Sequence, residues 1–334
     1  MRALVFHGPF DMSVEERPEP RPGPADALLE ILATGICGSD LHGYAGRTGR
    51  RHPGQVMGHE TVARVLDDKT GWHQPGTLVT VNPVLGCGHC PACTAGSPQR
   101  CPERRVIGVQ AELSAAFAER MTAPSPNVVA LPDGTPAEIG ALVEPLAVGY
   151  HALRRGGLTS GDVLHVLGGG PIGQAVAIAA RRLGTATIVV AEPDPGRRDL
   201  LTALGFTAVD DISRAPGSPP TLVVDAVGAT ATVTQALEIT PPGGRIVLVG
   251  MADPAIEIPA YAVSTGERTL LGSFSYDNAA FTETAAWAGA HAAELAPLIE
   301  AHITLDEAPA RFRTLAEGRL PAGKVLVHPT REHP

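Results

Sequence analysis

The stretch DVLHVLGGGPIGQAVAIAARRLG, residues 162–184, joins an apolar strand to an amphipathic helix through a run of glycines. These glycines have the G-x-G-x-x-G spacing that permits a tight turn, close approach of a pyrophosphate and close helix–strand packing. The helix N-terminus that follows suits the phosphate charge. The stretch therefore predicts a dinucleotide-binding site, whose residues are Gly168, Gly170, Pro171, Ile172 and Gly173.

The residues that follow bear on which dinucleotide binds. Glu192 ends the next predicted strand, TIVVAE, where a carboxylate can bind the ribose hydroxyls. A carboxylate there repels a 2′-phosphate, so we expect NAD, with NADP as the alternative. Arg197 and Arg198 would suit NADP, although a solvated helix start is the simpler interpretation of both. We include Arg197 among the predicted coenzyme residues.

The pattern around this stretch changes along the chain. Residues 146–277 alternate apolar strands with helices, which is typical of a parallel sheet covered on both faces. The first 130 residues instead predict short antiparallel strands broken by Gly and Pro. From about residue 278 a helix-rich stretch covers 281–301 and a short strand, KVLVHP, ends the chain. The fold class is α/β.

The length, the apolar runs and the net charge of the chain exclude some classes of protein and partner. The 334 residues suggest about two domains, and no apolar run approaches the roughly 20 residues of a membrane span. The start, MRALVFHG, does not resemble a secretory signal. A net charge of −9 argues against a nucleic-acid partner. We expect a cytoplasmic protein with neither nucleic acid nor membrane as partner.

Four of the five cysteines form one cluster, which consists of Cys87, Cys90, Cys93 and Cys101. Four thiolates on a compact loop match the closed tetrahedral shell of a structural zinc ion. Four buried free thiols are the alternative. We expect His89, which lies within the cluster, to face solvent.

A second set of metal ligands is predicted from GICGSDLH, residues 35–42, and GHE, residues 58–60. A catalytic zinc ion keeps three protein ligands and an open position, and Cys37 and His59 are the natural first two. Either Glu60 or Glu144 supplies the third, since Glu144 lies in an otherwise apolar helix where a carboxylate needs a partner. Asp40 is the candidate for orienting His59.

Together, GICGSDLH with GHE, the four-cysteine loop and GGGPIG resemble the zinc-containing medium-chain dehydrogenase/reductase superfamily over essentially the whole chain. ALVEPLAVGYHA and GSFSYDNAAF are similar to its polyol branch, which includes sorbitol, butanediol and threonine dehydrogenases. The resemblance implies a GroES-like β-rich catalytic domain (1–145) with the structural zinc loop (87–101). It also implies a Rossmann domain (146–277) and a C-terminal return to the catalytic domain (278–334). The stretch DDISRAPGSPPTLVVDAVG, residues 210–228, is shorter than is usual in this family, which predicts a Pro-rich loop in place of one Rossmann helix.

The resemblance also implies roles for single residues. Catalytic zinc is bound by Cys37, His59 and either Glu60 or Glu144, while Ser39 and His42 match the positions of a proton relay. Two zinc ions per subunit and NAD are the implied cofactors. The family usually forms dimers or tetramers through an edge of the Rossmann sheet, for which ERTLLGSF is the candidate strand, so we expect a homodimer or homotetramer.

The implied activity is hydride transfer between NAD(P) and a secondary alcohol, a polyol, a cyclitol or an amino alcohol, which interconverts alcohol and ketone. The alternatives are a zinc-free reductase of the same superfamily and a non-catalytic dinucleotide-binding protein on this fold. Tyr44, Arg47, Glu119 and Tyr276 are candidates for a polar substrate pocket, and each is equally compatible with an ordinary surface position.

Overall fold

The computed structural model describes residues 1–330 and divides the chain into two compact units. The first comprises Met1–Glu144 and Asp277–Pro334, and the second comprises Pro145–Tyr276. The end of the expected C-terminal segment, residues 331–334, lies outside the described residues. Within residues 1–330, no helix combines the length and the apolar character needed to cross a membrane.

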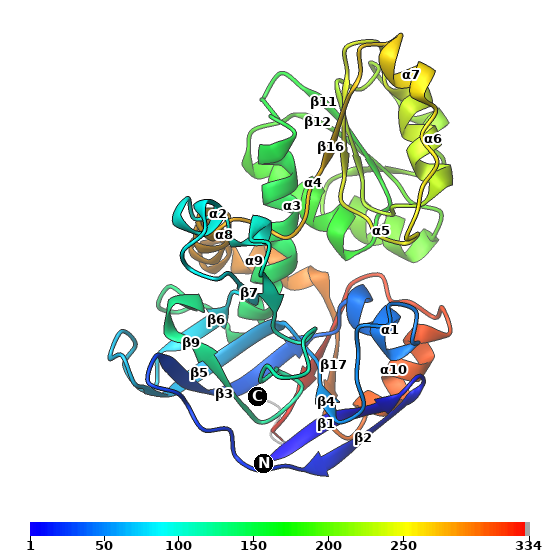
Figure 1. The fold of residues 1–334 in the computed structure, drawn as a ribbon. Coiled ribbons are helices and arrows are strands. Elements are labelled where there is room, and N and C mark those ends of the chain that lie inside the picture. Colours follow the sequence, from blue (N-terminus) through cyan, green and yellow to red (C-terminus); the bar gives the residue numbers. More distant parts are fainter. Residues whose placement is uncertain (331–334) are drawn as a thin grey trace. The chain divides into compact units, whose positions relative to one another are not determined.

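The second unit is built on a six-stranded sheet in the order β13-β12-β11-β14-β15-β16 (Figure 1). Its strands are β11 (Val163–Leu167), β12 (Thr187–Ala191), β13 (Thr207–Val209), β14 (Leu222–Asp225), β15 (Arg245–Leu248) and β16 (Thr269–Gly272). Every neighbouring pair is parallel. The predicted parallel sheet is thus confirmed, and its apolar strands are buried because helices cover both faces.

The helices of this unit are α3 (Val143–Arg155), whose first two residues belong to the first unit, α4 (Pro171–Arg182), α5 (Pro195–Ala203), α6 (Thr230–Ile239) and α7 (Ala260–Ser264). α4 packs on the face of the sheet that carries Val166, whereas α6 packs on the opposite face with Val223 and Ile246. Between β13 and β14 stands only a short 3-10 helix, Ile212–Arg214, so the predicted loss of one helix is confirmed.

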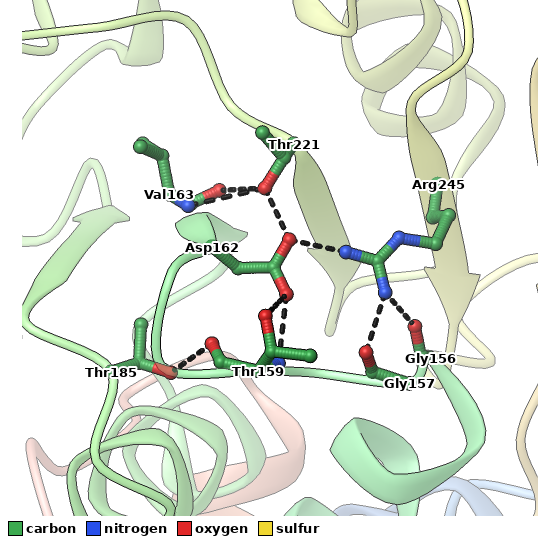
Figure 2. A network of polar contacts seen from close by, with 8 residues as sticks. All are labelled: Gly156, Gly157, Thr159, Asp162, Val163, Thr185, Thr221 and Arg245. Atoms are coloured by element: carbon green, nitrogen blue, oxygen red, sulfur yellow. Dashed lines mark hydrogen bonds and ion pairs between the residues drawn. The ribbon is translucent and has the colours of Figure 1, made fainter.

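A polar network fixes the amino ends of the central strands (Figure 2). Asp162, just before β11, accepts hydrogen bonds from the backbone N–H and hydroxyl of Thr159 and from the hydroxyl of Thr221. Arg245 forms an ion pair with Asp162 and donates to the carbonyl oxygens of Gly156 and Gly157. Burial raises the pKa of Asp162, but these hydrogen bonds and the Arg245 charge outweigh burial and lower it overall. The network leaves the opposite, carboxyl ends of the strands for binding.

The first unit contains three sheets. The largest has seven strands in the order β10-β6-β5-β3-β18-β17, with β9 also paired to β3, and the smaller sheets are β2-β1-β4 and β7-β8. The strands are β1 (Arg2–Gly8), β2 (Asp11–Glu16), β3 (Asp26–Gly35), β4 (Gln55–Val56), β5 (Glu60–Asp68), β6 (Leu78–Val81), β7 (Val84–Leu85), β8 (Arg105–Val106), β9 (Arg120–Pro124), β10 (Val128–Ala130), β17 (Ile299–Thr304) and β18 (Lys324–His328). All these pairs are antiparallel except β17–β18, so the β-rich prediction is confirmed.

The helices of the first unit are α1 (Gly38–Tyr44), α2 (Pro91–Thr94), α8 (Asn278–Ala290), α9 (Ala292–Leu295) and α10 (Ala308–Ala316). The predicted helix-rich stretch 281–301 is correct only in part, because residues 299–301 belong to β17. This strand pairs in parallel with β18, the predicted final strand, which in turn joins β3. The strands β17 and β18 therefore enter the same sheet as β3 and β5, which come from the N-terminal part of the chain.

Candidate functional site

Three potential metal ligands meet where β3 and β5 are paired. Cys37 is the N-cap of α1 just beyond β3, and Gly35 at the end of β3 lies opposite Glu60 at the start of β5. Cys37, His59 and Glu60 each offer one ligand atom, and these atoms lie within 4.8 Å of one another. A Cβ at Gly35 would overlap the Glu60 carboxylate, so glycine is required for this close approach.

Asp40 lies behind this group of ligands. Its side chain is completely buried, with Oδ1 3.5 Å from Nδ1 of His59, and Oδ2 accepts a hydrogen bond from the backbone N–H of Cys37 at 3.2 Å. Burial lowers the pKa of His59, but the charges of Asp40 and Cys37 outweigh it and raise the pKa well above its usual 6.5. The site therefore favours a positive charge beside His59, which a divalent metal ion would supply. A thiolate, an imidazole and a carboxylate form a donor set that suits zinc.

Lys324, from the last strand, completes the surroundings of Glu60. Its ammonium group forms an ion pair with Glu60 and donates a hydrogen bond to the carbonyl oxygen of Ile36 at 2.8 Å. Burial lowers the pKa of Lys324, but Glu60, Cys37 and Glu144 together raise it, so the lysine is a cation. Glu144 is buried in the first turn of α3 and close enough to act on Lys324, but the group of mutually close ligand atoms contains Glu60 and not Glu144.

The two residues of the predicted proton relay lie on α1. Ser39 Oγ is 3.5 Å from Nε2 of His59, which places this hydroxyl at the metal group. His42 is half-buried in the last turn of α1. Its partial burial, and then the nearby charge of Arg47, lower the pKa of His42. The imidazole is therefore neutral at neutral pH and able to accept a proton.

The four-cysteine cluster is a separate site in the same unit. Cys87, Cys90, Cys93 and Cys101 place their sulfur atoms within 4.8 Å of one another. Hydrogen bonds from the backbone N–H groups of His89 and Cys90 lower the pKa of Cys87 to about 6. A hydrogen bond from the backbone N–H of Gly88 lowers the pKa of Cys93, but burial and the neighbouring thiols outweigh it and raise this pKa to about 11. Cys87 is therefore the thiolate that the protein alone favours, and a bound zinc ion would favour the others. The imidazole of His89 is exposed, as predicted.

The glycine loop between β11 and α4 has the close contacts that a dinucleotide site needs. Gly168 has a φ of 94°, in the region that favours glycine. A Cβ at Gly173 would overlap the carbonyl oxygen of Gly168, so only glycine allows α4 to approach the loop. Gly170 is the N-cap of α4, with Pro171 and Ile172 in its first turn. The backbone N–H groups of this turn form a cradle that suits a pyrophosphate.

Glu192 lies just after β12, against the glycine loop. Its carboxylate accepts hydrogen bonds from the backbone N–H groups of Gly169 at 2.7 Å and Asp194 at 3.0 Å. Arg197 Nη1 lies 3.7 Å from the same carboxylate, whereas Arg198 donates to the carbonyl oxygens of Glu192 and Pro193. Both predicted coenzyme residues, Glu192 and Arg197, are thus brought to the loop.

The sequence analysis did not identify Lys324 as part of the metal group. Two of the residues proposed for a substrate pocket, Tyr44 and Glu119, make other contacts in the structure. Nothing in KVLVHP indicates that Lys324 reaches Glu60, since the contact depends on how β18 enters the sheet. Tyr44 is buried in a cluster with Phe10 and Phe312, at ring-centroid distances of 5.5 Å and 5.6 Å, which argues against a role in substrate binding. Glu119 accepts a hydrogen bond from the backbone N–H of Arg2 at 2.8 Å.

Comparison with known proteins shows two matching families. The alcohol dehydrogenase GroES-like domain matches residues 23–133, and the zinc-binding dehydrogenase domain matches residues 171–290. The chain is 30% identical to sorbitol dehydrogenase of Ovis aries over 95% of this chain and 93% of that protein. It is 31% identical to L-galactonate-5-dehydrogenase of Escherichia coli K12, over 82% and 83% of the two chains.

Solved structures agree with these matches. An E. coli CFT073 alcohol dehydrogenase complexed with NADH has a TM-score of 0.89 and 26% identity, covering 98% of this chain and 99% of its own. A zinc-binding dehydrogenase from Sinorhizobium meliloti 1021 bound to NADP has a TM-score of 0.87 and 30% identity, with the same coverage.

Proposed function

The chain belongs to the zinc-containing medium-chain dehydrogenase/reductase superfamily, in its polyol dehydrogenase branch, and from this premise we propose which residues carry out its reaction. It is an NAD(P)-dependent oxidoreductase that interconverts a secondary alcohol or polyol and the corresponding ketone. We propose that residues 1–145 with the C-terminal segment from 278 form the catalytic domain. Residues 146–277 form the domain that binds the dinucleotide.

The observation that carries the proposal is the group formed by Cys37, His59 and Glu60. These residues would hold the catalytic zinc, with Asp40 orienting His59. When bound, zinc supplies Lewis acidity at the alcohol oxygen and the nicotinamide exchanges the hydride. The protein supplies the proton path: Ser39 Oγ lies at the metal group to receive the alcohol proton, and the neutral imidazole of His42 passes a proton to solvent.

Glu60 is our choice for the third protein ligand. Its carboxylate is within 4.8 Å of the Cys37 and His59 ligand atoms, while the buried cation of Lys324 compensates part of its charge. Glu144 is then a second carboxylate near Lys324 that neighbours the metal without binding it. Three protein ligands would leave a tetrahedral zinc ion one position for substrate, as a catalytic site requires.

The structural zinc and the coenzyme have their own residues. Cys87, Cys90, Cys93 and Cys101 would hold the structural zinc, which contributes folding energy and not chemistry. Gly168, Gly170, Pro171, Ile172 and Gly173 would surround the pyrophosphate. Glu192 and Arg197 would bind the ribose, and the carboxylate favours NAD over NADP.

We also propose a homodimer or homotetramer in the cytoplasm. β16 is an edge strand of the six-stranded sheet, and such an edge can pair with the same strand of a second copy. The segment before it exposes two large apolar side chains, Met251 at 65% and Tyr261 at 85%. An interface that covered this edge would remove both from water.

The test is a steady-state assay of the zinc-loaded enzyme with NAD and with NADP. The panel contains sorbitol, butane-2,3-diol, an inositol, threonine and L-galactonate, each compared with its deoxygenated or ketone counterpart. Oxidation of at least one secondary alcohol, with NAD preferred, supports the proposal. Bound zinc and coenzyme without turnover of any panel member would favour a non-catalytic dinucleotide-binding protein.

A further inference from the structure

Arg51 is a buried arginine in a loop whose other arginines are exposed. Its side chain is only 3% exposed, whereas Arg47 and Arg50 face solvent. The aliphatic part of Arg51 crosses α1 at Gly43, where a Cβ would lie 2.7 Å from Cγ of Arg51. Glycine at position 43 therefore opens the path by which this guanidinium enters the protein.

The guanidinium group of Arg51 lies beside the carboxylate of Asp40. Nη2 of Arg51 lies 3.8 Å from Oδ1 of Asp40, and Nε donates a hydrogen bond to the sulfur of Met57 at 3.2 Å. The same Oδ1 of Asp40 is 3.5 Å from Nδ1 of His59. Arg51 and His59 thus share one oxygen of a carboxylate that has no exposed surface.

Charge explains why Asp40 needs Arg51 in addition to His59. A buried carboxylate is costly unless a positive charge compensates it. An imidazole that ligates a metal must be neutral, so it can donate a hydrogen bond to Asp40 but brings no full charge. Burial lowers the pKa of Arg51 although Asp40 opposes this shift, and because an arginine stays protonated in proteins, Arg51 provides a permanent positive charge beside Asp40.

Asp40 acts on two of the proposed metal ligands at once. Oδ1 faces His59, and Oδ2 accepts the backbone N–H of Cys37 at 3.2 Å. A shift of this carboxylate would therefore move both an imidazole and a thiolate. We infer that Arg51 is a positioning residue of the catalytic metal site, which holds Asp40 in place and thereby fixes His59 and Cys37. This inference rests on the proposed metal ligands and adds a residue outside them.

The test compares Arg51→Met, which keeps an unbranched stem and removes the charge, with Arg51→Lys, which keeps the charge. Arg50→Met, in the same loop but exposed, is the matched control. Release of zinc to a chelator is followed in the purified enzyme. For Arg51→Met we expect about 10- to 100-fold weaker retention of one zinc ion per chain and unchanged retention of the other. Arg51→Lys should recover part of the loss, and Arg50→Met should match the native enzyme.

A second readout reports the geometry of the site directly. In the cobalt-substituted enzyme, Arg51→Met should change the thiolate-to-cobalt absorption bands, which Arg50→Met should leave unchanged. If Arg51 acts through Asp40, the double variant Arg51→Met/Asp40→Asn should retain zinc about as weakly as Asp40→Asn alone. The two effects should not add, because both substitutions disturb the same carboxylate. If Arg51→Met alone does not fold, the double variant should fold, since it no longer buries an uncompensated carboxylate.

Native zinc retention and native cobalt bands in Arg51→Met would overturn the inference, and so would independent, additive effects of the two substitutions. Failure of the double variant to fold would also overturn it, because Arg51 would then act through packing alone. These results are distinct from failure of the proposed function. A native enzyme that holds only the zinc of the four-cysteine loop would contradict the metal site itself, and the Arg51 inference with it.

Discussion

Lys324 and Glu60 form a buried ion pair although they come from the last and an early strand of the catalytic unit. β18 carries Lys324 next to β3, and β3 carries Cys37 at its end and pairs with β5, which begins at Glu60. The C-terminal segment therefore supplies charge to the metal group. The return of the chain to its first unit thus places a cation beside Glu60, in addition to the apolar core residues that the same segment contributes.

Loss of this cation should destabilise the catalytic unit. Lys324→Met leaves a buried carboxylate without its partner, and breaking a buried pair costs about 3–5 kcal/mol of unfolding free energy. Both tryptophans, Trp72 and Trp287, lie in this unit, so tryptophan fluorescence during denaturant unfolding reports on it alone. The control is Lys69→Met, which removes an exposed ion pair and should change stability by less than about 1 kcal/mol. Equal effects of both substitutions would contradict the account.

The two candidate third ligands can be separated by zinc content. Glu60→Gln should leave about one zinc per chain after dialysis, because it removes a ligand of the catalytic ion. Glu144→Gln should keep two zinc ions, although its turnover falls. Metal analysis of the two purified variants measures the difference. The reverse result would make Glu144 the ligand, and Glu60 would then be only the partner of Lys324.

Coenzyme binding should depend on the absence of a side chain at Gly173 in the glycine loop. Gly173→Ala should weaken NADH binding at least about 10-fold, since an added methyl group overlaps the Gly168 carbonyl oxygen and forces α4 away from the loop. Gly161→Ala is the control, because a Cβ there meets nothing within 4 Å. NADH fluorescence titration gives both dissociation constants. Native affinity in Gly173→Ala would show that the nucleotide does not bind at this loop.

Stability at low pH should depend on Asp68, the last residue of β5. Burial raises the pKa of Asp68, but hydrogen bonds from Thr70, Ser125 and His73 outweigh it and lower the pKa to about 2. Because the folded pKa is below the usual 3.8, ionised Asp68 stabilises the folded state above pH 3.8. This stabilisation is lost as the pH falls towards 2.

Asp68→Asn should therefore be less stable than the native chain near neutral pH, and the difference should shrink between pH 3.8 and about 2. The control is Asp67→Asn, at the neighbouring and half-exposed position, which should change stability near neutral pH by less than about 1 kcal/mol. Unfolding followed by tryptophan fluorescence at each pH measures both. A difference that stays constant down to pH 2 would show that Asp68 is not ionised preferentially in the folded state.

Local sequence was sufficient for the parts of the site whose residues are close in the chain. The glycine loop and the four-cysteine loop are each formed by a short segment, so spacing alone predicts that the groups meet. The parallel sheet followed equally from alternating strands and helices. Cys37 and His59 were predicted from the ligand types in GICGSDLH and GHE, whereas their proximity depends on the antiparallel pairing of β3 with β5.

The remaining features depend on tertiary contacts that no local pattern encodes. In the sequence, Lys324 is only the polar first residue of a predicted strand. Arg51 is one of several arginines in a polar loop. Residues 299–301 were predicted as helix because their pattern continues that of α8, whereas pairing with β18 makes them a strand. Tyr44 looks suited to a pocket, but packing against Phe312 places it in the core.

The central claim is that a zinc ion held by Cys37 and its neighbours drives alcohol oxidation, while a second zinc only stabilises the fold. The most direct measurement is the zinc content of Cys37→Ser and Cys93→Ala together with their polyol-dependent NADH formation. Both should hold about one zinc per chain. Cys37→Ser should keep most of its thermal stability and lose activity, whereas Cys93→Ala should lose thermal stability first. Full activity in Cys37→Ser, with native zinc content, would contradict the account.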